Sequence, residues 1–156
     1  MLFYFSSMPY HFKEITSTPE RFFSILPADW RGAIAPYWPE YSGTARIFTL
    51  ESGDEVVGGG ILFSTPAPDI LAYGEEARYW FENGFLYIGF LWIAEVHRGK
   101  QLGSLWLQQL QDRLPGQSFW LSIDDYSLKG FYERNGYRLV KEVSLETGTE
   151  WVMTKG

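Results

Sequence analysis

The chain of 156 residues has no cysteine and only two histidines, His11 and His97. The absence of cysteine excludes disulfides, thiolate metal sites and cysteine nucleophiles. With two histidines and no clustered carboxylates, the sequence also predicts no metal centre. We interpret His11 as structural and His97 as a surface residue.

Basic residues are fewer than acidic ones, 13 against 19, which gives a net charge of −6. An acidic chain is a poor candidate for general nucleic-acid binding, which relies on a basic surface. Long hydrophobic runs are missing too, because the longest, Phe85 to Ala94, is half of the roughly 20 residues that a membrane helix needs. The N-terminus has no basic leader and too short an apolar stretch for a signal peptide. We therefore expect a soluble, cytoplasmic protein without membrane contact.

Aromatic residues are abundant, with 7 Trp, 10 Tyr and 12 Phe. Length and composition predict one globular domain, residues 1–156, with a sizeable core. We expect most aromatic rings in that core. Those in or near loop-like or amphipathic segments are candidates to line a pocket: Tyr37, Trp38, Tyr41, Tyr73, Tyr79, Trp80 and Phe81.

The apolar pattern alternates between strand-like and helix-like segments. Strands are expected at residues 10–15, 45–51, 56–64, 85–93, 118–123, 137–143 and 150–154. Helices are expected at residues 17–26, 70–83, 102–114 and 127–135, with a short helix or an ordered loop within 28–43. This order predicts a single mixed α/β domain. Within it, Gly58 to Gly60 mark either a bulge or close backbone approach, or a flexible strand start.

A glycine-containing basic turn joins the strand at 85–93 to the helix at 102–114. Arg98, Gly99 and Gly103 place free backbone N–H groups at the positive end of that helix, which is a site for phosphate. The glycines remove bulk that would block a ligand. Further N–H groups near the helix start come from Lys100, Gln101, Leu102 and Ser104.

A second motif follows the strand at 118–123, where Phe131-Tyr132 lies on a short helix before Gly136-Tyr137. In this order, residues 91–104 resemble the acetyl-CoA-binding motif of the GNAT N-acetyltransferase family, and residues 121–137 resemble its C-terminal motif. The resemblance is sharpest over residues 86–140. It implies an α/β (α+β) fold with a mixed, mostly antiparallel central sheet, splayed central strands and flanking helices.

The resemblance also implies acetyl-CoA as cosubstrate and a set of site residues. The backbone N–H near Ile93 would bind the oxyanion, and Tyr132 would be the general acid, with a packed helix tyrosine as the alternative. Arg98 would approach the pyrophosphate or hold the turn, with an exposed turn residue as the alternative. The loop 98–104 and Phe131 complete the expected CoA site. Gln101 stands where the family usually has glycine.

Two assignments stay open in the sequence. Asp125 is a candidate for the CoA site, although capping of the helix 127–135 is the interpretation we favour. No residue identifies itself as the general base. The candidates lie on or near the central strands: Tyr87, Glu82, Glu95 and Asp124. Glu75 and Glu76 are expected as solvated helix charges.

The expected activity is transfer of an acetyl group from acetyl-CoA to a primary amine through a tetrahedral intermediate. The acceptor, a small molecule, a peptide or a protein amine, should contact residues 28–43 and 66–84. There, aromatic rings and carboxylates, including Glu40, suit an ammonium group. The alternatives are a non-catalytic acyl-CoA-binding module and an aromatic-rich interaction domain. The final hairpin and the exposed aromatics allow a homodimer without establishing one.

Overall fold

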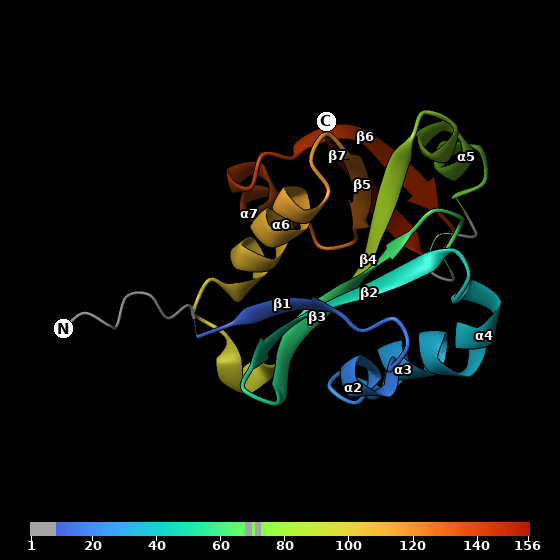
Figure 1. Cartoon of the computed structure of the whole chain (residues 1–156). Coiled ribbons are helices and arrows are strands. Elements are labelled where there is room, and N and C mark those ends of the chain that lie inside the picture. The colour runs from blue at the N-terminus through green and yellow to red at the C-terminus, as the bar shows by residue number, and fades with distance from the viewer. Residues whose placement is uncertain (1–8, 68–69, 71–72) are drawn as a thin grey trace.

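The computed structural model describes residues 9–67, 70 and 73–156. Its seven strands form one sheet in the order β1-β2-β3-β4-β5-β7-β6 (Figure 1). The strands are β1 (His11–Glu14), β2 (Ala45–Ser52), β3 (Glu55–Phe63), β4 (Phe85–Ile93), β5 (Ser118–Ile123), β6 (Arg138–Leu145) and β7 (Gly148–Lys155). The pair β4–β5 is parallel, and every other neighbouring pair is antiparallel. The predicted mixed, mostly antiparallel sheet is therefore confirmed.

Helices flank this sheet (Figure 1). They are α2 (Glu20–Phe23), α3 (Ala28–Ile34), α4 (Trp38–Tyr41), α5 (Glu75–Glu82), α6 (Leu102–Arg113) and α7 (Lys129–Arg134), with short 3-10 turns η1 (Ala35–Tyr37), η3 (Glu95–His97) and η4 (Tyr126–Leu128). The segment 28–43 thus holds consecutive helical turns. The helix expected at 70–83 begins only at Glu75, and residues 71–72 lie outside the described residues. Among the described residues, no helix has the length and apolarity needed to cross a membrane.

The glycines of β3 allow close packing on the sheet. A Cβ on Gly60 would lie 2.7 Å from Cζ2 of Trp106, whose ring is fully buried. The Trp106 indole N–H donates to the carbonyl of Phe48 at 3.0 Å, so the large ring brings no unpaired polar group into the core. The close-approach interpretation of this triplet is confirmed, and it explains how α6 lies flat on β2 and β3.

The centre of the sheet is forked. The parallel strands β4 and β5 pair only from Phe85↔Ser118 to Tyr87↔Trp120, and beyond Tyr87 no pairing joins them. The fork starts close to an irregularity in β4, because the β3–β4 register shifts between Gly59 and Ile61. Phe90 lies in that shift with φ of 57°, a left-handed conformation that is strained for an aromatic residue. The predicted splay of the central strands is confirmed.

Candidate functional site

Two pockets open where β4 and β5 diverge. The fork pocket, about 440 Å³, lies between the two strands and extends to α3. The loop pocket, about 370 Å³, lies between the end of β4, the turn 98–103 and α7. Leu91, Leu128 and Tyr132 line both pockets, so the two lie side by side, and together they are called the cleft. Its position predicts that a ligand held at the loop can reach into the fork.

The turn before α6 carries the expected donors. In the part of the chain that the structure describes, the backbone N–H groups of residues 99–104 make no hydrogen bond, and the first bonded amide is Leu105 N–H to Gln101 O. Six successive unpaired amides at the start of a 12-residue helix form a concentrated anion-binding site. Gln101 has φ of 60° and ψ of 29°, so it adopts the left-handed conformation for which glycine is favoured. The turn keeps a glycine-like shape without the glycine.

Arg98 holds this turn in place. Its Nε donates to the carbonyl of Ile93 at 3.0 Å, and its guanidinium carbon lies 4.4 Å from the centre of the Trp92 ring. Both contacts join the turn to the end of β4. The side chain is otherwise exposed and lines the loop pocket together with Gly99, Gln101 and Leu102, whose amides are unpaired.

Gly103 has a different role from the one expected. A Cβ there would lie 3.0 Å from Cζ of Phe131, so the glycine lets α7 approach α6. Asn135 joins the same two helices, since its Nδ2 donates to Ser104 Oγ at 3.1 Å and to the carbonyl of Phe131 at 2.9 Å. Phe131 forms a wall of the loop pocket. Lys100 is exposed beside the turn and lines neither pocket.

The peptide of Ile93 faces the fork. Ala94 N–H donates to the carbonyl of Val57 at 2.9 Å, which makes Val57 and Ala94 a hydrogen-bonded pair of the antiparallel ladder. Because bonded and non-bonded pairs alternate, the next pair, Gly58↔Ile93, is non-bonded. The N–H and C=O of Ile93 therefore point away from β3, towards the side where β5 has diverged. The predicted oxyanion donor has the required direction.

Tyr132 lines both pockets from α7. Its ring packs edge-on against Phe131 and Tyr137, with centroids 4.9 and 5.9 Å away. Its hydroxyl makes no hydrogen bond with any described residue. Burial raises the pKa of Tyr132 to about 12, so the phenol keeps its proton at neutral pH. The general-acid role and the packed-tyrosine alternative are both compatible with this placement, and the general-acid role stays a prediction.

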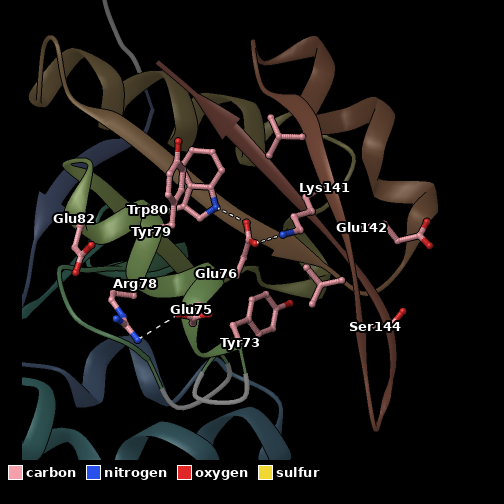
Figure 2. Close-up of a pocket in the computed structure, with 12 residues that line it drawn as sticks. Tyr73, Glu75, Glu76, Arg78, Tyr79, Trp80, Glu82, Lys141, Glu142 and Ser144 are labelled. Carbon is pink, nitrogen blue, oxygen red and sulfur yellow. Dashed lines mark hydrogen bonds and ion pairs between the residues drawn. The ribbon is translucent and has the colours of Figure 1, made fainter.

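The structure separates the four candidate bases. Tyr87 is buried on β4, Asp124 is exposed at the end of β5, and both line the fork pocket. Glu95 lies exposed in η3 and lines neither pocket. Glu82 lies at the end of α5, on the wall of a third, wide hollow between α5 and β6 (Figure 2). The cleft therefore contains two of the four.

That hollow also corrects an expectation about α5. Glu75 is 91% exposed, but Glu76 is only 12% exposed. Figure 2 shows the Glu76 carboxylate between Trp80 and Lys141, bonded to the indole N–H at 2.8 Å and to the ammonium at 2.8 Å. Glu76 therefore joins α5 to the edge strand β6 and is not a solvated charge.

Asp125 caps the 3-10 turn η4. Its carboxylate accepts from the backbone N–H of Ser127 at 2.9 Å and from the Ser127 hydroxyl at 2.7 Å. The hydrogen bonds from the Ser127 hydroxyl and amide lower the pKa of Asp125. The capping interpretation is confirmed, and the cap fixes where the chain turns into α7. His97 also has a partner, because its Nε2 lies 2.9 Å from Glu55.

Sequence patterns missed two acidic residues of the fork pocket, Asp29 on α3 and Glu150 on β7. Glu150 lies near the start of β7, after the turn 146–147, and the pairing of β7 with β5 brings it to the fork. Among the described residues, no lysine, arginine or histidine lines this pocket, whereas Asp29, Asp124 and Glu150 do. The pocket therefore favours a cation. Among the described residues, no group of three or more His, Cys, Asp or Glu could hold a metal ion.

The chain is similar to proteins of one family. Residues 12–137 match the model of the acetyltransferase (GNAT) family. Among curated protein sequences, none matches this chain.

Solved structures share the fold across nearly the whole chain. A candidate acyl-CoA N-acyltransferase from Klebsiella pneumoniae has a TM-score of 0.64 and 21% identity, covering 94% of this chain and 96% of that one. An acetyltransferase from Thermus thermophilus has a TM-score of 0.63 and 19% identity, and the match covers 95% of this chain and 97% of that one. A candidate streptothricin acetyltransferase from Bacillus anthracis, solved with acetyl coenzyme A, has a TM-score of 0.55 and 14% identity. The match covers 76% of this chain and 66% of that one. At these identities the likeness shows the fold.

Proposed function

Because the chain belongs to the GNAT acetyltransferase family, we propose that it transfers an acetyl group from acetyl-CoA to a primary amine. One observation carries this proposal. Residues 99 and 101–103, whose amides are unpaired, and Tyr132 line a cleft that ends in an acidic fork. An anion-binding end and a cation-favouring end are what an acyl-CoA and an ammonium acceptor require.

The residues present fit acetyl-CoA. The amides of 99–104 and the outer N–H groups of Arg98 would bind the pyrophosphate, which needs several donors converging on one anion. The loop pocket leads from this turn along Leu91, Ile93 and Phe131 to the fork. Its lining is mostly apolar, which suits the pantetheine chain once the peptide groups of β4 meet its amides. The thioester would then lie near Ile93 and Tyr132.

The proposed reaction is a direct displacement at the thioester carbonyl. The amine nitrogen attacks the carbonyl carbon, and the Ile93 N–H stabilises the oxyanion that forms. The carbon–sulfur bond then breaks, and Tyr132 gives its proton to the departing sulfur. The sulfur then leaves as a neutral thiol, so no negative charge on the leaving group has to be stabilised. The high pKa of Tyr132 keeps that proton available at every pH at which the amine reacts.

The acceptor is proposed to be an amine without a neighbouring carboxylate. Three carboxylates line the fork pocket and no basic side chain does. An acceptor that carries its own carboxylate beside the amine, as a free amino acid does, would be repelled by these side chains. A diamine, or a lysine side chain in a peptide, would be attracted. Trp30, which lines the pocket from α3, adds an aromatic face for the ammonium.

The test measures thiol release from acetyl-CoA with a panel of amines. We expect turnover with a simple aliphatic diamine or Nα-acetyl-lysine amide and little with free amino acids. Tyr132→Phe should lower kcat about 100-fold, the low end of general acid catalysis, with little change in acetyl-CoA binding. Tyr126→Phe is the matched control, because Tyr126 is half-exposed on η4, stacks on Trp151 and lines neither pocket.

Two results would contradict the proposal. Tight acetyl-CoA binding with no thiol release for any amine would favour a non-catalytic acyl-CoA-binding module. No thermal stabilisation by acetyl-CoA at all, in the wild-type chain and in Arg98→Ala alike, would favour an interaction domain without a CoA site.

A further inference from the structure

We infer that Glu150, oriented by Tyr73, binds the acceptor ammonium in the fork and takes its proton. This inference rests on the proposed function and supplies its missing general base. It differs from every candidate that the sequence offered, because Glu150 comes from the C-terminal hairpin rather than from the central strands or α5.

The register of the sheet decides which face Glu150 occupies. Trp120 and Ser122 alternate onto one face of β5 and pair with Thr154 and Val152 of β7. Glu150 lies two residues before Val152, so its side chain points to that same face.

The α5 side of the sheet is this face. The Trp120 ring lies 6.3 Å from Tyr73 and 5.6 Å from Phe81 of α5. Lys141, which pairs with Val152, reaches Glu76 of α5 (Figure 2). Both contacts place Glu150 on the side covered by α5 and its preceding turn.

Tyr132 belongs to the opposite face. Trp151, next to Glu150, packs edge-on against Tyr126 with ring centroids 5.0 Å apart, and Tyr126 begins the turn that leads into α7. Lys155 Nζ donates to the carbonyl of Asn135 at the end of α7. Glu150 and Tyr132 therefore line the fork pocket from opposite faces of the sheet. A thioester in the fork would have the proton acceptor on the amine side and the proton donor on the sulfur side.

The surroundings of Glu150 suit a base. Its Oε1 accepts a hydrogen bond from the Tyr73 hydroxyl, and its Oε2 has no partner among the described residues. Tyr73 is 6% exposed, so its ring is fixed by packing, and Figure 2 shows its hydroxyl directed towards the C-terminal hairpin. A neutral phenol orients the carboxylate without cancelling its charge. One oxygen therefore stays available to an ammonium group.

The other acidic groups of the fork pocket are less suited. Asp29 and Asp124 are exposed, so water competes for their carboxylates, whereas Glu150 is half-buried. Tyr87 is buried, and a phenol is a weaker proton acceptor than a carboxylate when it carries its own proton. Of the carboxylates that line the cleft, Glu150 alone is both partly shielded from water and held by a neighbour.

The proton balance closes with these residues. The ammonium of the acceptor loses one proton to Glu150, and the amine lone pair then forms the bond to the carbonyl carbon. As the carbon–sulfur bond breaks, the sulfur takes a proton from Tyr132. The nitrogen loses a second proton, which restores Tyr132. Glu150 finally releases its proton to water, so the net products are the amide, the free thiol and one proton.

The experiment compares Glu150→Gln with Glu146→Gln, the same isosteric change at an exposed residue of the same hairpin that lines neither pocket. With Nα-acetyl-lysine amide as acceptor, Glu150→Gln should lower kcat/KM about 100-fold, and Glu146→Gln by less than about threefold. Tyr73→Phe keeps the carboxylate but loses its orientation, so a loss of about three- to tenfold is expected. Acetyl-CoA binding, measured by calorimetry, should be unchanged in all three.

A weakly basic acceptor separates proton transfer from structural damage. Methoxyamine carries no proton to remove at neutral pH, so the defect of Glu150→Gln should shrink with it. Equal rates for Glu150→Gln and Glu146→Gln with active wild-type enzyme would overturn the role of Glu150 and leave the proposed function standing. An equal defect with both acceptors would also overturn it. If the wild-type enzyme acetylates no amine, the proposed function fails and this inference fails with it.

Discussion

Glu51 on β2 and Glu150 on β7 lie towards opposite ends of the sheet and differ in what surrounds their carboxylates. Glu51 is 1% exposed and receives two hydrogen bonds from Arg21, at 2.9 and 3.0 Å, and one from Thr49. Glu150 is half-buried and receives one hydrogen bond, from a neutral phenol. The first carboxylate is fully compensated, whereas the second keeps an unpaired oxygen beside a cleft.

The same contrast extends to the backbone at the two ends. Around β1 and β2 the backbone has ordinary conformations, except for a glycine turn at Gly53. Two non-glycine residues in the described part of the chain have positive φ: Phe90 lines the fork pocket, and Gln101 lines the loop pocket beside it. Unpaired amides, an unpaired hydroxyl and strained residues therefore gather in one place, which is typical of a functional site. At the β1–β2 end, by contrast, the buried Glu51 carboxylate has its hydrogen-bond partners.

The largest expected effect comes from breaking the compensated end. Arg21→Ala leaves the Glu51 carboxylate buried without its bidentate partner, which typically costs about 3–5 kcal/mol. Because Arg21 is itself 39% exposed, we expect the low end of that range. Arg46→Ala is the control, since it breaks an exposed pair with Glu14 worth about 1 kcal/mol or less. Urea denaturation measures both.

The pH dependence sharpens this prediction. Burial acts to raise the pKa of Glu51, but the hydrogen bonds from Arg21 and Thr49 outweigh it, so the pKa is lowered. A lowered pKa adds stability that is present above the unfolded value of about 4.3 and is lost as the pH falls. The difference between wild type and Arg21→Ala should therefore narrow in acid. An equal difference at all pH values would show that Arg21 stabilises through packing alone.

The order of the elements could be predicted from the sequence because it depends on local periodicity. The strand at 85–93 and the helix at 102–114 match β4 and α6 closely. The loop amides were also predictable, since a strand, a turn with glycines and a helix fix them locally. Glu150 was not, because its approach to the fork depends on the register of β7 against β5, a contact between distant segments. Glu76 was misjudged for the same reason, since its partner Lys141 lies on β6.

The role of Gly103 shows a second limit. A glycine in a phosphate-binding pattern suggests space for a ligand, yet the space is taken by Phe131. The sequence contains both residues but not the distance between α6 and α7. Likewise, the left-handed conformation of Gln101 could not be predicted from the sequence, because glycine is the residue that normally indicates a positive φ.

An intermediate effect is expected at the fork in alkali. Burial raises the pKa of Tyr132 to about 12, against about 10 in the unfolded chain. A raised pKa means that the folded state resists ionisation, so stability is full below pH 10 and falls as the pH rises from about 10 to about 12. Burial, and then the neighbouring Tyr132, raise the pKa of Tyr137 in the same direction. Tyr132→Phe should flatten this alkaline loss in denaturation measured from pH 8 upwards, whereas Tyr126→Phe should leave it unchanged.

The smallest effect tests the strain in the loop. A left-handed conformation costs an L-residue about 1–2 kcal/mol. A glycine at this position avoids that cost, but part of the gain is offset because glycine loses more conformational entropy on folding. Gln101→Gly should therefore raise stability by up to about 1 kcal/mol, and it should leave acetyl-CoA binding intact because the amide donor stays. Gln101→Val should destabilise the protein, since a β-branched residue resists positive φ. Equal melting temperatures for the two variants would show that residue 101 is not held in the left-handed region. Higher stability with glycine and lower stability with valine would show that the turn before α6 holds residue 101 in a strained conformation, and that a single substitution relieves the strain.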